Sequence, residues 1–97
     1  MRLRIAAEAR ADLRDIATYI ALDNPARAKT FIAELSNKIR TAAQRPMSFP
    51  ARDDWKPGLR AALHRPYLIV FRIGDGFVEV LRVLHGARNV AKIIRED

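Results

Sequence analysis

Hydrophobic and polar residues alternate over the first six residues and then follow a helical period. Leu3 and Ile5 are separated by arginines, which is the pattern of a short strand with one buried face. From about Ala7 the apolar positions recur every three or four residues, which predicts an amphipathic helix. No Ser, Thr, Asp or Asn stands at its start to cap the first turn. The apolar positions of this helix are Ala9, Leu13, Ile16, Ala17 and Ile20. Its charged positions, read as a solvated outer face, are Glu8, Arg10, Asp12, Arg14 and Asp15.

A second helix is predicted after the segment LDNPARA. Asn24 is a suitable N-cap, and Pro25 suits the first helical position because its missing N–H would have no partner there. One apolar stripe then continues as far as Pro46, made by Phe31, Leu35, Ile39 and Ala42. The short connection predicts an antiparallel pair of helices.

A proline-rich loop over residues 46–58 separates the helices from three predicted strands. A loop of this length is unusual in a small domain, and such loops are often functional. The strands are predicted over residues 59–64, 67–73 and 77–85, where apolar and β-branched residues dominate. The GDG sequence at residues 74–76 indicates a hairpin between the last two strands.

This order of elements predicts a small α+β fold, β-α-α-β-β-β, in one domain over residues 1–97. Each helix has a single apolar stripe, so the helix pair is expected to cover one face of an antiparallel-rich sheet. The other face would be open to water or to a partner. No structure is assigned to the C-terminal tail, residues 88–97.

Composition narrows the possible functions. A chain of 97 residues with 49% apolar residues can bury a modest core. It has no cysteine, which excludes disulfides and thiolate metal sites and fits a reducing cytoplasm. No apolar run approaches the roughly 20 residues of a membrane span. The net charge of +7 favours an acidic or polyanionic partner.

The hairpin register determines where two arginines of the last strands lie. With a two-residue turn at Asp75–Gly76, Arg72 would oppose Glu79 and Arg82 would oppose Ile69. With a three-residue turn, both arginines would lie on one apolar face of the sheet. The sequence leaves both registers open.

Four arginines are candidates for an anion-binding surface: Arg60, Arg72, Arg82 and Arg88. If they gather on the open face of the sheet, their planar guanidinium groups would suit phosphates and carboxylates. In the alternative interpretation they are edge or surface residues with buried stems and solvated heads.

The histidines and the single tryptophan also allow two interpretations each. His85 is either a general acid or base, or a hydrogen-bonding residue that fixes the end of a strand. His64 is read as structural. Trp55 either packs on the core or is an exposed anchor for a partner. Two histidines without carboxylates at ligand spacing do not indicate a metal site, and no cofactor motif is present.

Three segments together resemble the ParE branch of the RelE/ParE toxin superfamily. They are EARADLRDIATYIALDNPARAKTFIAEL, KPGLRAALHRPYLIVFRI and VEVLRVLHGARN, and the resemblance runs over residues 3–89. Their combination in this order is more specific than any one of them. The resemblance implies a toxin of a bacterial type II toxin–antitoxin system with the fold predicted above.

The same resemblance implies partners and a mode of action. A ParD-like antitoxin would wrap the toxin in a hetero-oligomer, and the apolar surface of the helix pair is its expected docking place. ParE-like toxins poison DNA gyrase, so the chain would be a cytoplasmic inhibitor without a cofactor and not a catalyst. It would meet nucleic acid only indirectly and would not involve a membrane.

The RelE branch provides the alternative function, ribosome-dependent cleavage of mRNA. That reaction needs cations at the scissile phosphate and a group that moves protons. These roles would fall to Arg60, Arg72, Arg82 and His85. However, the tyrosine typical of RelE-like C-terminal segments is replaced near Ala91, and Lys56 stands alone where a lysine-rich stretch is common.

On the ParE interpretation, the end of the last strand is the candidate contact site. Arg82, His85 and Arg88 would form a cationic end of the sheet that binds gyrase or the antitoxin, and Arg82→Ala or Arg88→Ala would remove toxicity without unfolding the protein. Further candidate contact residues are Arg60, Arg72 and Trp55.

Overall fold

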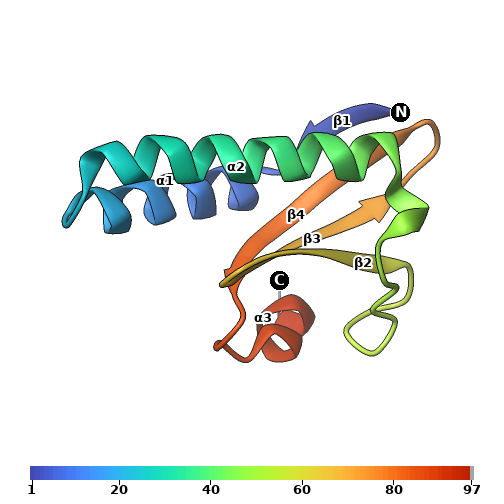
Figure 1. The fold of residues 1–97 in the computed structure, drawn as a ribbon. Helices are drawn as coiled ribbons and strands as arrows, with labels where there is room; N and C mark the ends of the chain where they lie inside the picture. Colours follow the sequence, from blue (N-terminus) through green and yellow to red (C-terminus); the bar gives the residue numbers. More distant parts are fainter. Residues whose placement is uncertain (97) are drawn as a thin grey trace.

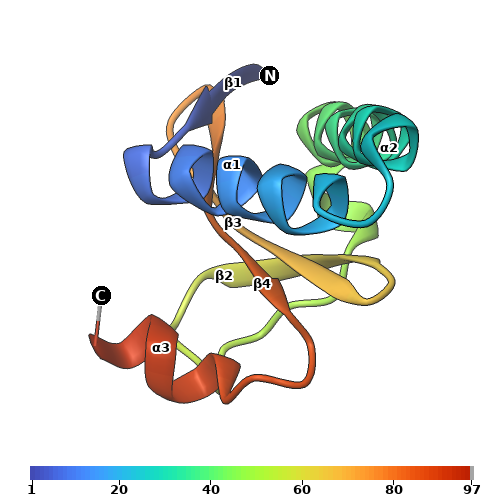
Figure 2. The same cartoon turned by 90° about the vertical axis from the view of Figure 1, so that its left-hand side faces the viewer.

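The computed structural model describes residues 1–96, and it shows a four-stranded sheet with helices on both faces (Figures 1 and 2). The elements in chain order are β1 (Arg2–Ile5), α1 (Ala7–Ala21), α2 (Pro25–Gln44), a 3-10 turn (Pro46–Ser48), β2 (Leu59–His64), β3 (Tyr67–Ile73), β4 (Phe77–His85) and α3 (Val90–Glu96). The predicted α+β fold is confirmed, and β2, β3 and β4 have the predicted bounds.

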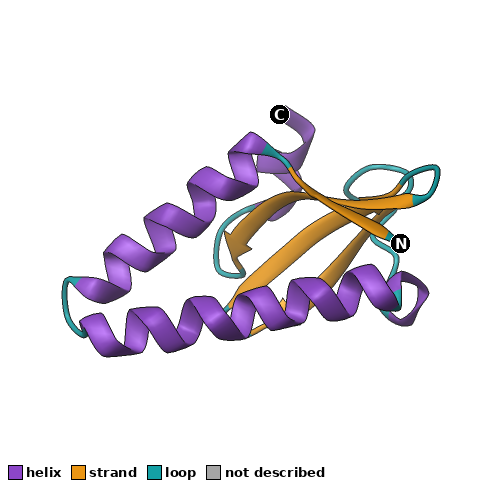
Figure 3. Ribbon diagram, turned by 90° about the horizontal axis from the view of Figure 1, so that it is seen from above, coloured by secondary structure: helices purple, strands orange, loops and turns teal. Residues whose placement is uncertain are grey.

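The strands are ordered β1-β4-β3-β2. The three later strands form an antiparallel meander, and β1 joins it parallel to β4, with Leu3 opposite Val78. Helices α1 and α2 lie side by side over one face of this sheet (Figure 3). Their apolar stripes meet the sheet in a core that includes Leu35, Ile69 and Phe71, each fully buried.

The helix ends follow the local sequence. Helix α1 begins after Ala6 without a side-chain cap, as predicted. Helix α2 begins at Pro25, and the Asn24 side chain accepts a hydrogen bond of 3.0 Å from the backbone N–H of Arg27. The cap fixes the turn between the helices, so the two lie antiparallel.

The hairpin between β3 and β4 has the two-residue turn. The backbone N–H of Gly74 donates to the carbonyl of Phe77 at 2.8 Å, and Gly76 has a φ of +76°, which favours glycine. Arg72 therefore lies opposite Glu79.

A bulge changes the register further along the same hairpin. Phe71 pairs with Val80, but Val70 pairs with Arg82, which leaves Leu81 as an extra residue on β4. The predicted pairing of Arg82 with Ile69 is therefore wrong. The sequence has no glycine or proline at this point to mark the bulge.

The second face of the sheet is covered, contrary to the prediction that it would be open. The C-terminal tail folds into α3 and packs there together with the proline-rich loop (Figure 2). The buried residues of this second core are Trp55, Leu59, Ala61, Val70, Leu84, Val90 and Ile94. Within residues 1–96, every helix is too short or too polar to span a bilayer.

Candidate functional site

Asp12 and Arg82 form an ion pair at the edge of the sheet. The Asp12 carboxylate accepts hydrogen bonds from Arg82 Nε at 2.8 Å and from an Arg82 terminal nitrogen at 3.0 Å. It also accepts from the backbone N–H of Val83 at 2.9 Å. The side chains are only 12% and 15% exposed, so the assignment of Asp12 to a solvated helix face is wrong.

The geometry of β1 explains this pair. Strand β1 accompanies β4 only as far as Val80, where the Ala6 N–H donates to the Val80 carbonyl at 2.9 Å. Beyond that point no strand within residues 1–96 pairs with this edge of β4, and α1 passes beside it. The Asp12 carboxylate therefore takes the Val83 N–H that a neighbouring strand would otherwise bind.

The other two strand arginines also have partners of their own. Arg72 Nε donates to Glu79 at 2.9 Å, across the hairpin. Arg60 donates to the backbone carbonyl of Phe49 at 2.7 Å. The structure gives these arginines separate roles. The edge or surface interpretation fits Arg72, whose side chain is 42% exposed, but not Arg82, whose guanidinium lies in a part-buried ion pair. The expected gathering of Arg60, Arg72, Arg82 and Arg88 on an open face is wrong, since each of the first three binds its own oxygen and the second face is covered.

His85 and Trp55 follow the structural interpretations. His85 Nδ1 accepts a hydrogen bond of 3.0 Å from the Ala87 N–H, so a neutral ring carries its proton on Nε2. This bond fixes the exit of β4. Trp55 is 6% exposed and part of the second core, so it is not an exposed anchor.

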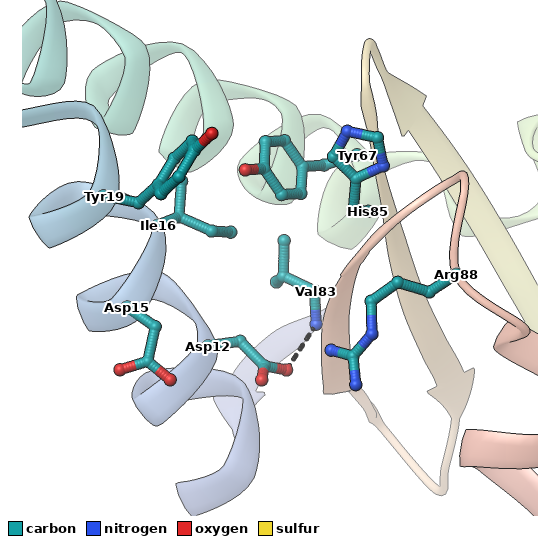
Figure 4. A pocket seen from close by; sticks show the side chains of 8 residues that line it. All are labelled: Asp12, Asp15, Ile16, Tyr19, Tyr67, Val83, His85 and Arg88. Atoms are coloured by element: carbon teal, nitrogen blue, oxygen red, sulfur yellow. Dashed lines mark hydrogen bonds between the residues drawn. The ribbon is translucent and has the colours of Figure 1, made fainter. Parts of the chain in front are cut away.

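Two adjoining hollows lie at the C-terminal end of β4, and together they form what we call the aromatic cleft. Both are lined by Tyr19, Tyr67 and His85, and Figure 4 shows the smaller one. The smaller hollow, of about 200 Å³, is also lined by Asp12, Asp15, Ile16, Val83 and Arg88. The larger hollow, of about 560 Å³, is also lined by Ile20, Arg27, Phe31, Arg65 and Pro66.

The rings of the cleft differ in exposure. Tyr19 is 72% exposed, whereas Tyr67 is half-buried and packs edge-on against His85, with ring centroids 5.3 Å apart. Burial raises the pKa of Tyr67, and the nearby Tyr19 raises it further. The Tyr67 hydroxyl therefore stays protonated and uncharged at physiological pH.

One wall of the larger hollow is fixed by a cluster around Glu34. Its carboxylate binds Arg27 at 2.5 Å and lies 2.9 Å from His64 Nε2. These hydrogen bonds, from Arg27 first and His64 second, lower the pKa of Glu34. Arg27 also lies 5.1 Å from the centre of the Phe31 ring. His64 thus has the structural role that its position predicted.

A separate groove runs between α1 and α2, and we call it the outer groove. It has a volume of about 590 Å³ and is lined by Ala17, Thr18, Ala21, Pro25, Ala28, Lys29 and Ile32. Helical spacing places the exposed Arg10 and Arg14 on the same face of α1 as this groove, nearly opposite Tyr19.

Sequence reasoning missed the aromatic cleft. Tyr19 and Tyr67 are 48 positions apart in the sequence (67 minus 19), and only the fold brings them together. The one available signal was Tyr19 itself, a large ring beside the polar face of an amphipathic helix. Within residues 1–96, no three His, Asp or Glu side chains are placed to hold a metal ion.

Comparison with known proteins identifies the family. The sequence model described as "ParE toxin of type II toxin-antitoxin system, parDE" matches residues 3–90, nearly the whole chain. This protein belongs to the ParE toxin family. The resemblance stated from the sequence is thereby confirmed.

Two relatives extend the comparison. Toxin ParE3 of Caulobacter vibrioides is 34% identical over 59 residues, which is 57% of this chain and 59% of that protein. The chain thus matches less than two thirds of that relative's length. A structure titled "Chromosomal ParDE TA system from P. aeruginosa" is 26% identical, with a TM-score of 0.76 over 88% of this chain and 95% of that one. The ParE fold is therefore shared over most of the molecule.

Proposed function

We propose that this protein is the toxin of a type II toxin–antitoxin pair that inhibits DNA gyrase in the cytoplasm and is neutralised by a ParD-like antitoxin. The observation that carries the proposal is the family match over residues 3–90, which the fold of the ParDE structure supports. On this proposal the protein acts by binding and needs no cofactor.

The arrangement of the arginines favours binding over mRNA cleavage. A nuclease of the RelE type would direct several cations at one phosphate. Here Arg60, Arg72 and Arg82 are held by oxygens of three different groups of the protein. The Nδ1 atom of His85 is also engaged. These contacts would have to be rearranged before a catalytic group could form.

The gyrase proposal is tested by a supercoiling assay. Purified gyrase and relaxed plasmid are mixed with increasing amounts of this protein, and both supercoiled and cleaved DNA are scored. We expect supercoiling to fall while cleaved DNA accumulates. Arg88→Ala, at an exposed position beside the end of β4, should weaken inhibition about tenfold, as loss of one interface arginine typically does.

The matched control for that assay is Arg10→Ala, which removes the same charge from an exposed position on the far side of α1. It should inhibit like the natural protein. No inhibition by folded natural protein would refute the gyrase target. The next assay would then measure mRNA cleavage on ribosomes, with His85→Ala as the first variant.

The outer groove is the proposed docking place of the antitoxin. Its walls are mainly small apolar side chains, which allow a partner helix to approach closely. Lys29 lines the groove, and helical spacing places the exposed Arg10 and Arg14 on the same side of α1. An amphipathic helix with acidic flanks would therefore match both the shape and the charge of this surface.

A charge placed in the outer groove should weaken antitoxin binding. Thr18→Glu changes an exposed groove position without altering the core, and it would place a carboxylate against the partner's apolar side. We expect affinity for the ParD-like antitoxin to fall about thirtyfold, or about 2 kcal/mol. Titration calorimetry measures the change. Thr41→Glu, the same substitution at the far end of α2, should bind the antitoxin with normal affinity. If the natural protein and both variants bind the antitoxin equally well, the outer groove is not its docking place.

A further inference from the structure

The aromatic cleft brings together rings and cations that lie far apart in the sequence. Tyr19 comes from α1, Tyr67 from the start of β3 and His85 from the end of β4 (Figure 4). Arg65 and Arg88 lie in two turns that are joined by a hydrogen bond of 2.8 Å from the Gly86 N–H to the Pro66 carbonyl. This grouping was not predicted from the sequence, because the aromatic and basic residues do not alternate along the chain.

Two cations of the cleft are available for a ligand. Arg65 and Arg88 are exposed, and within residues 1–96 neither forms an ion pair, whereas Arg27 is bound to Glu34. The other acidic residues nearby are Asp12, whose charge is compensated by Arg82, and Asp15, which is exposed on α1. Free guanidinium groups beside accessible rings are the combination that binds an unpaired nucleotide. The ring stacks on the base, and the guanidinium binds the phosphate.

We infer that the aromatic cleft binds single-stranded nucleic acid. An unpaired base stacks on Tyr19, the more exposed of the two tyrosines, and the neighbouring phosphates bind at Arg65 and Arg88. The larger hollow, of about 560 Å³, lies within the usual size range of small-molecule sites. A duplex offers no free base face to these rings, so it binds less well. This inference goes beyond the proposed gyrase inhibition and replaces the expectation of an indirect contact with nucleic acid by a direct one.

The test measures fluorescence anisotropy of labelled oligo-dT, oligo-U and a mixed-sequence duplex, each titrated with the full chain. Single strands should bind more tightly than the duplex. Tyr19→Ala should weaken single-strand binding about tenfold, whereas Tyr19→Phe, which keeps the ring, should bind like the natural protein. Tyr19 is 72% exposed, so neither change disturbs the core.

Two double variants distinguish specific binding of the single strand at the cleft from general attraction to a basic protein. Arg65→Ala with Arg88→Ala removes two charges at the cleft, and Arg10→Ala with Arg14→Ala removes two on the opposite face of α1. The first should lose about tenfold in affinity and the second about twofold or less, because only the first removes direct phosphate contacts.

Three results would overturn the inference: equal losses in the two double variants, a duplex bound as tightly as the single strands, or no loss with Tyr19→Ala. If oligo-dT or oligo-U binds more tightly than the duplex and the variants lose affinity as expected, the inference is supported. The strand that binds more tightly then identifies the nucleic acid as DNA or RNA. Because this test contains no gyrase, its failure is distinct from failure of the proposed function.

Discussion

Replacing Asp12 with alanine should lower the free energy of unfolding by about 3 kcal/mol. The change removes a part-buried ion pair, in which the Arg82 side chain is 15% exposed, and it leaves the Val83 N–H without its Asp12 acceptor. Loss of the ion pair and an unbonded backbone N–H in a poorly hydrated place both destabilise the folded state. Since domains of this size are stable by about 5–15 kcal/mol, this is a large fraction of the total.

Thermal unfolding followed by circular dichroism measures the effect. A loss of about 3 kcal/mol corresponds to a fall in Tm of roughly 10 to 25 °C for a domain of this length. Asp15→Ala is the matched control, because Asp15 is exposed on the same helix and should change Tm little. If the two variants melt together, the Asp12–Arg82 pair does not hold α1 to the sheet.

A paired exchange tests the cause. Asp12→Leu together with Arg82→Met replaces the ion pair by apolar side chains, and such exchanges are often neutral for stability. The double variant should therefore be more stable than Asp12→Ala. The double variant also bears on toxicity. From the sequence, Arg82→Ala is expected to reduce toxicity by removing a contact with the target. Because Arg82 is bound to Asp12 in the structure, we predict that much of any loss of toxicity comes from unfolding instead. A toxic double variant would show that Arg82 does not touch the target.

Local signals in the sequence were sufficient for the elements of the fold. The helical spacing that ends at Pro46, the cap at Asn24 and the turn at Asp75–Gly76 each depend on neighbouring residues only. For such features, backbone geometry and the nearest side chains decide the outcome. The bounds of the three later strands followed from the same kind of signal.

The parts that the sequence did not reveal depend on distant residues. Asp12 looks solvated on a helical wheel. It binds the backbone of Val83, 71 positions away, because β1 ends at Ile5 and leaves that part of the β4 edge unpaired by a strand. The bulge that aligns Arg82 with Val70 has no local marker. Helix α3 is too short to be predicted by periodicity, and it is stabilised by packing on the second core.

The same distinction applies to the candidate sites. The outer groove follows from two predicted helices and their stripes, so its place could be expected from the sequence. The aromatic cleft needs the end of α1 to meet the turn before β3 and the turn after β4, which lie at the same end of the β3–β4 ladder. Helical geometry places the two surfaces on nearly opposite sides of α1, so antitoxin binding and nucleic acid binding can be separated by substitution.

Trp55→Ala should have the second large effect, a loss of about 4 kcal/mol in the free energy of unfolding. Trp55 is 6% exposed and packs among Val70, Leu84 and Ile94, so its removal leaves a cavity between the loop and α3. The Arg52 guanidinium, 3.7 Å from the centre of the Trp55 ring, loses its cation–π contact as well.

The place of that loss makes the prediction specific. Helix α3 is held by apolar packing on the second core and by a hydrogen bond of 2.9 Å from Arg95 to the Asp54 carbonyl. Without Trp55 the loop that carries Asp54 loosens, so trypsin should cut at Lys92 much faster than in the natural protein, as mass spectrometry can follow. Met47→Ala, at a position 71% exposed in the same loop, should leave both Tm and cleavage unchanged. If Trp55→Ala lowers Tm while cleavage at Lys92 stays slow, α3 packs on the sheet without help from the loop. The helix alone then covers the second face of the sheet.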